Sequence, residues 1–126
     1  MTTEAGTIIV GCIELGVISL LGLNIEHQPI FWGESNREHV EINHPLVYTK
    51  YGSVLPSVIS GILKAPDYVG SRNNAIEYVK LMPDRDILKV AVRASKKGVY
   101  YARTMYLIRQ SELIKFLAKS TLVKIS

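Results

Sequence analysis

A chain of 126 residues, nearly half of them apolar and about a fifth charged, can bury a substantial core, which argues against disorder. The single cysteine, Cys12, excludes an intrachain disulfide and indicates a reducing compartment or indifference to redox conditions. We therefore expect a cytoplasmic protein formed by one domain over residues 1–126, with Cys12 as a small core residue. The net charge of +4 and the isoelectric point near 9.2 favour an anionic partner.

Residues 6–23 are the most apolar segment, and we predict a buried helix of about four turns there. The β-branched residues of this segment leave a strand at its start as an alternative. Glu14 at its centre and three interior glycines argue against a membrane span. Glu4 precedes the segment and no Lys or Arg does, which argues against a signal peptide. No membrane association is expected.

Further along, residues 29–33 (PIFWG) predict a short strand stopped by glycine. Ser35 or Asn36 can then cap a helix, which Pro45 should end near His44. Apolar residues with helical spacing predict a second helix over residues 48–64, ended by the Pro66–Asp67 pair. Residues 70–74 are predicted to form a polar turn.

The C-terminal half alternates between apolar and polar residues, which predicts strands over residues 75–81, 87–94 and 99–108. Turns are expected at residues 83–85 and 96–98, a helix from Ser111 to Lys119, and an edge strand over residues 122–125. This order predicts an α+β fold in which N-terminal helices pack on one face of an antiparallel β-sheet. The opposite face is then free to carry polar chemistry.

Residues 34–50 combine general acid–base candidates with cationic groups more densely than any other stretch. His39 and His44 lie there, and one imidazole could take a proton while the other returns it. Such a pair, with a cation to hold phosphate, is sufficient for metal-free cleavage of RNA. Tyr48 and Lys50 are further candidates because they follow closely. Two surface histidines on a polar helix would explain the same pattern equally well.

A metal site is not predicted. Residues five apart on a helix point about 140° apart, whereas histidine pairs that bind zinc on a helix are usually four apart. We expect no cluster of cysteine or carboxylate groups around His27. The sequence also lacks a glycine-rich phosphate loop, which argues against nucleotide-transfer chemistry. We therefore expect no metal and no cofactor.

Several short motifs in a fixed order resemble the phage-associated branch of the barnase, EndoU, colicin and RelE-like nucleases (the BECR fold). They are EHVEINHP, APDYVG, AIEYVK, ILKVAVRAS and YYARTMYLI, and the similarity extends over residues 8–125. The resemblance implies a metal-independent ribonuclease, often a toxin or a phage-borne effector. His39 and His44 match the helix-borne histidines, Arg93 the basic strand position, and Thr104 with Tyr106 the polar pair of a late strand.

The matched strand residues also suit the chemistry. Arg93 could present its planar fork to phosphate, Thr104 could hydrogen-bond a non-bridging oxygen, and Tyr106 could do the same or stack on a base. Each residue alone is equally explained by strand packing. Lys89 and Lys96 are predicted to bind substrate, as members of a basic C-terminal region.

The predicted function is therefore RNA cleavage to a 2′,3′-cyclic phosphate by acid–base catalysis. Its partners would be an RNA substrate and a cognate antitoxin or immunity protein of acidic character. Two alternatives remain open: a nucleic-acid-binding module of the same fold that does not cut, and a protein-interaction domain that uses a tyrosine-rich sheet.

Overall fold

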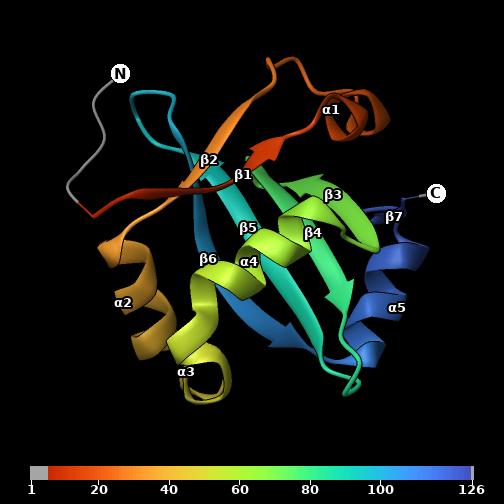
Figure 1. The fold of residues 1–126 in the computed structure, drawn as a ribbon. Coiled ribbons are helices and arrows are strands. Elements are labelled where there is room, and N and C mark those ends of the chain that lie inside the picture. Colours follow the sequence, from red (N-terminus) through yellow and green to blue (C-terminus); the bar gives the residue numbers. More distant parts are fainter. Residues whose placement is uncertain (1–5, 126) are drawn as a thin grey trace.

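The computed structural model describes residues 6–125, in which a seven-stranded sheet forms the centre of the molecule (Figure 1). The strand order is β1-β2-β6-β5-β4-β3-β7, and neighbouring strands are antiparallel except for the parallel pair β2–β6. The strands are β1 (Ile8–Ile13), β2 (Gln28–Trp32), β3 (Tyr68–Arg72), β4 (Ala75–Leu81), β5 (Ile87–Ala94), β6 (Tyr100–Ile108) and β7 (Val123–Lys124). The α+β fold class is confirmed.

Helices accompany the sheet on both faces. They are α1 (Leu15–Leu21), α2 (Glu34–Asn43), α3 (Pro45–Tyr51), α4 (Leu55–Lys64) and α5 (Gln110–Ala118), with a 3₁₀ turn at Gly52–Val54. Helix α4 crosses one face of the sheet, where Ile59 and Ile62 join the main core with Tyr78 and Val90 (Figure 1). Helix α5 covers part of the other face, where Phe116 and Leu117 pack on a smaller apolar cluster. The remainder of that second face stays open.

The predicted long helix over residues 6–23 is wrong, and the alternative of a strand at its start is correct. The β-branched residues at its start form edge strand β1, as their preference for extended backbone would suggest. The helical part begins only after Glu14 and ends at Gly22, whose left-handed backbone (φ 63°) and amide contacts close the last turn. Among residues 6–125, no helix is long and apolar enough to cross a membrane.

The predicted turn at residues 70–74 is also wrong in part, because residues 68–72 form β3. The turn itself is formed by Asn73 and Asn74, both with positive φ, which is the geometry of a tight β3–β4 hairpin. Gly70 is required within β3: a Cβ atom there would lie 1.9 Å from the Thr121 carbonyl oxygen. The glycine therefore lets the chain before β7 pass closely over β3.

The other elements deviate in detail. Helix α2 is preceded by Gly33, and Asn36 accepts a hydrogen bond from the Gly33 amide at 2.9 Å instead of occupying the cap position. Helix α3 begins at Pro45, so the expected helix over 48–64 is divided by the 3₁₀ turn. The last helix is capped at Arg109 rather than Ser111, with the Arg109 amide bonded to Glu112. The strands at residues 75–81 and 87–94 have the predicted bounds.

Candidate active site

A cleft of about 470 Å³ lies on the open part of the second sheet face, between α2 and strands β3 to β6. That volume is typical of small-molecule and substrate sites. The side chains that line it come from α2, from the β3–β4 hairpin and from the three central strands. They are Ser35, Asn36, His39, Arg72, Asn73, Ala75, Glu77, Ala91, Arg93, Arg103, Thr104 and Tyr106. The cleft thus draws on residues far apart in the sequence.

The register of the sheet explains why the predicted strand residues meet there. Ala91 pairs with Thr104 and Lys89 pairs with Tyr106, so Thr104 and Tyr106 share the face of the odd-numbered residues of β5. Arg93, which pairs with Tyr101, belongs to that face too, so the register that the sequence left open brings it into the same cleft as Thr104. A β-bulge in β6 adds one residue, Arg103, between the partners of Ala91 and Val92. The bulge directs an additional cation to the cleft.

The cleft is rich in positive charge. Three arginines line it, Arg72, Arg93 and Arg103, against a single carboxylate, that of Glu77. Glu77 is buried and pairs with Lys89 at 2.7 Å and with Arg72 at 3.3 Å, so its charge is already balanced. Arg93 and Arg103 therefore leave a net positive field in the cleft, which favours a phosphate group.

Several buried polar atoms of the cleft have no hydrogen-bond partner among residues 6–125. They are Thr104 Oγ1, Glu77 Oε1 and Arg72 Nε. Buried polar atoms nearly always have a hydrogen-bond partner, and one left alone costs stability. Three such atoms lie around one cleft, where a polar ligand or an ordered water could complete their bonding.

His39 lies on the cleft wall, exposed on α2, and its ring nitrogen Nδ1 is 3.2 Å from Asn43 Nδ2. The same Asn43 amide donates to the His39 carbonyl oxygen, so it acts as a donor and its contact fits a His39 ring that carries its proton on Nε2. That nitrogen is then the one left to contact a substrate.

His44 does not line the cleft. It terminates α2 with non-helical backbone, and at this break its ring meets the His39 ring edge-on, with the ring centres 5.6 Å apart. On its other side it stacks on Tyr106, with ring centres 5.1 Å apart. Burial, and then the charge of His39, lower the pKa of His44, so that it is neutral near pH 7. The two histidines and Tyr106 thus form one contiguous group.

A second recess of about 350 Å³ continues the cleft past the start of α2 and shares Ser35, Asn36 and Arg103 with it. Lys96, which sequence reasoning selected, lines this recess together with Lys97 from the β5–β6 hairpin. The two hollows together make a groove lined by three arginines and two lysines.

Three other predicted binding residues lie elsewhere. Lys89 is fully buried, which corrects its assignment to substrate binding: its ammonium group lies against Glu77 and 4.5 Å from the centre of the Phe116 ring. Lys50 binds Asp84 and Asp86 beside the β4–β5 turn. Tyr48 accepts a hydrogen bond from Arg37 at 3.1 Å. None of the three lines the cleft.

Sequence reasoning missed Arg72, Asn73 and Arg103 in the cleft. The signal for the first two was the Asn73–Asn74 pair between alternating segments, a pattern typical of tight hairpins. No sequence pattern indicated Arg103, because it is the extra residue of a bulge, and strand alternation does not predict which face such a residue takes. The expectation that no cluster of cysteine or carboxylate groups surrounds His27 is wrong: Cys12 and Glu14 lie beside it in the structure.

An α+β sheet with an open, basic face beside a histidine-bearing helix has the architecture of a small nuclease. Residues 7–115 match the family model described as phage-Barnase-EndoU-ColicinE5/D-RelE like nuclease3, and the chain belongs to this family. The resemblance inferred from the motifs is confirmed. No curated protein and no solved structure matches the chain. The family implies a nuclease and a nucleic acid substrate.

Proposed function

We propose that the chain is a metal-independent endoribonuclease that cuts RNA by transesterification in the basic cleft. The observation that carries this proposal is the meeting of His39, three arginines and the unpartnered Thr104 hydroxyl on one open sheet face. Cations would hold the scissile phosphate, and the histidines would move the protons.

The reaction proceeds in one displacement. The 2′-hydroxyl attacks phosphorus and gives its proton to a histidine base, while the bond from phosphorus to the 5′-oxygen breaks and that oxygen takes a proton from an acid. The products are a 2′,3′-cyclic phosphate and a free 5′-hydroxyl. His39 lies on the cleft wall, and the neutral His44 contacts its ring. One of the two would act as the base, and the other, once protonated, as the acid. Tyr106 holds His44 in place by stacking.

Arg93 and Arg103 would contact the phosphate, and Thr104 Oγ1 would donate to a non-bridging oxygen. The groove that continues past α2 places Lys96 where it could hold a neighbouring phosphate. Metal independence is supported by the donor set. The one carboxylate that lines the cleft, Glu77, is already paired with two cations.

A protein with this activity needs a means of control, and a cognate inhibitor is part of the proposal. An acidic antitoxin or immunity protein would cover the cleft, because three arginines and two lysines line the joined groove. Such a complex should weaken steeply as salt concentration rises.

The test incubates wild type, His39→Ala and His44→Ala with total RNA and with tRNA in EDTA. Circular dichroism establishes that each protein is folded. Cleavage by wild type that leaves cyclic phosphate ends, with a loss of at least about 100-fold in either variant, is expected. Lys64→Ala, which removes a cation from α4 on the opposite face, is the matched control and should cut normally. The pH–rate profiles of the two histidine variants identify the base.

Intact RNA with every folded protein would overturn the nuclease proposal. Binding of RNA that weakens with salt would then favour a nucleic-acid-binding module of the same fold. Cleavage that requires an added divalent metal would overturn metal independence alone.

A further inference from the structure

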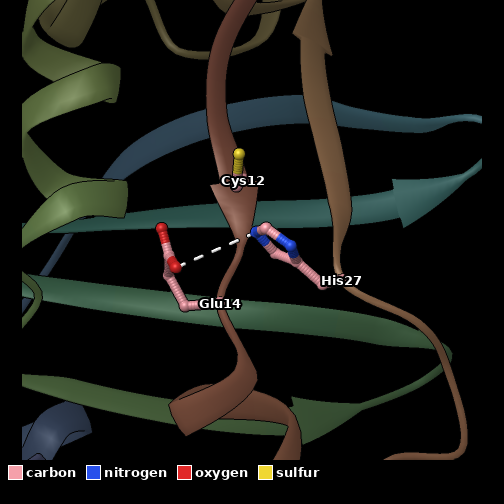
Figure 2. A group of neighbouring side chains, drawn as sticks. All are labelled: Cys12, Glu14 and His27. Atoms are coloured by element: carbon pink, nitrogen blue, oxygen red, sulfur yellow. Dashed lines mark ion pairs between the residues drawn. The ribbon is translucent and has the colours of Figure 1, made fainter.

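A second cluster of reactive side chains lies at the end of β1, away from the cleft. Cys12, Glu14 and His27 each offer one possible ligand atom, and these atoms lie within 4.8 Å of one another (Figure 2). His27 Nε2 is 4.0 Å from Glu14 Oε2. None of the three residues lines the cleft.

The sheet register produces this cluster. Glu14 follows β1 with extended backbone (φ −75°, ψ 148°), and side chains two apart on an extended chain point to the same side, so Glu14 lies on the side of Cys12. The β1–β2 pairing reaches Ile13 and Gln28, and Glu14 and His27 are the next residues beyond this last pair. The three residues therefore converge through backbone pairing, although α1 and the loop after it separate Glu14 from His27 in the sequence.

We propose that Cys12, Glu14 and His27 form a binding site for a divalent transition metal, with zinc as the best fit. Thiolate, imidazole and carboxylate together are a donor set that zinc prefers, whereas magnesium and calcium take oxygen ligands. Bonds of about 2.0–2.3 Å to zinc require the ligand atoms to draw together by about 1 Å. The side chains of His27 and Glu14 are 51% and 63% exposed, so they are free to make that movement.

Three protein ligands leave a fourth position for water. The bound ion would link the end of β1 to the start of β2, and so cross-link the two ends of the segment that contains α1. Burial raises the pKa of the unpartnered Tyr78 hydroxyl, and the charge of Glu14 raises it further. A positive ion bound at Glu14 would offset this second effect. The site would act on the stability of the N-terminal edge of the sheet and leave RNA chemistry to the cleft.

Cobalt titration of the metal-free full chain is the direct test. A single bound equivalent should produce a thiolate-to-cobalt charge-transfer band and the intense visible bands of tetrahedral cobalt, and zinc should remove both. Cys12→Ser should abolish the charge-transfer band, and His27→Asn or Glu14→Gln should weaken binding at least about 10-fold. Glu26→Gln and His39→Ala are matched controls, since they change the same residue types outside the cluster.

The single cysteine supplies a second measurement that needs no variant. Zinc should slow the reaction of Cys12 with a thiol reagent at least about 10-fold and raise the melting temperature by roughly 5–10 °C at a concentration about 100 times its dissociation constant. Unchanged thiol reactivity, or equal protection by magnesium, would overturn the proposal. Equal RNA cleavage by zinc-loaded and EDTA-treated protein is expected, so failure of this site leaves the nuclease proposal intact.

Discussion

The buried ion pair beneath the cleft offers a sharp prediction. Lys89 and Glu77 have side chains 1% and 6% exposed and lie 2.7 Å apart. Lys89→Met keeps a long apolar side chain but removes the ammonium group, and with it the ion pair and the cation contacts with the rings of Tyr106 and Phe116. Glu77 is then left in the interior with Arg72 at 3.3 Å as its remaining partner.

Removing one partner of a buried pair typically costs about 3–5 kcal/mol. We expect the lower end, about 3 kcal/mol, for Lys89→Met, because Arg72 still balances part of the Glu77 charge. Urea unfolding followed by the fluorescence of buried Trp32 measures this loss. With a slope of about 2 kcal/mol per molar urea, the midpoint should fall by about 1.5 M.

The double variant Lys89→Met with Glu77→Gln tests the cause. It removes both charges, so its loss should be smaller than the sum of the single losses by at least about 1 kcal/mol. Lys80→Met is the matched control: this half-exposed lysine of β4 lies 3.9 Å from Asp67, and its loss should stay below about 1 kcal/mol. Single losses below about 1 kcal/mol, or strict additivity, would refute the reasoning.

Three further predictions concern other parts of the chain. Gly70→Ala should destabilise the fold by about 2 kcal/mol or more in urea, because its methyl group meets the Thr121 carbonyl; wild-type stability would disprove the close approach. Because the pKa of His44 is lowered on folding, the unfolded chain binds more protons, and stability should fall as pH drops below about 6.5. Urea midpoints measured at several pH values should show that His44→Gln reduces this fall. An equal dependence of stability on pH in wild type and variant would contradict its attribution to His44. Arg103→Ala should weaken RNA binding and reduce the slope of log affinity against log salt by about 1, as fluorescence anisotropy would measure; an unchanged slope would remove Arg103 from the interface.

Local pattern was sufficient for the elements in which neighbouring residues determine the structure. The alternation over residues 75–81 and 87–94 predicted both strands with their bounds, and Pro45 located the break at His44. The helix predicted over residues 6–23 was wrong because an apolar run has no clear period that separates helix from strand. Its first part forms a strand because it pairs with β2. Fold class and family followed from the order of elements and motifs.

The candidate site was predictable where strand period decides which residues share a face. Thr104 and Tyr106 follow that rule, and His39 was identified by its residue type; their roles in catalysis stay predictions. Lys89 has the same alternation as Arg93, yet one is buried under α5 and the other lines the cleft. Only tertiary packing separates them. The neighbours of His27 likewise depend on a pairing between strands that no local motif announces.

The parallel pair β2–β6 has a consequence for how the protein is made. Residues 30 and 31 of β2 pair with residues 100 and 101 of β6. Strand β2 therefore cannot join the rest of the sheet until a segment about 70 residues later has been synthesised. The cleft has the same dependence, because α2 forms one wall and β6 contributes to the other. A chain emerging from the ribosome therefore has no complete cleft until β6 has left the exit tunnel. In the proposed ribonuclease, this order of synthesis would prevent the nascent chain from cutting RNA.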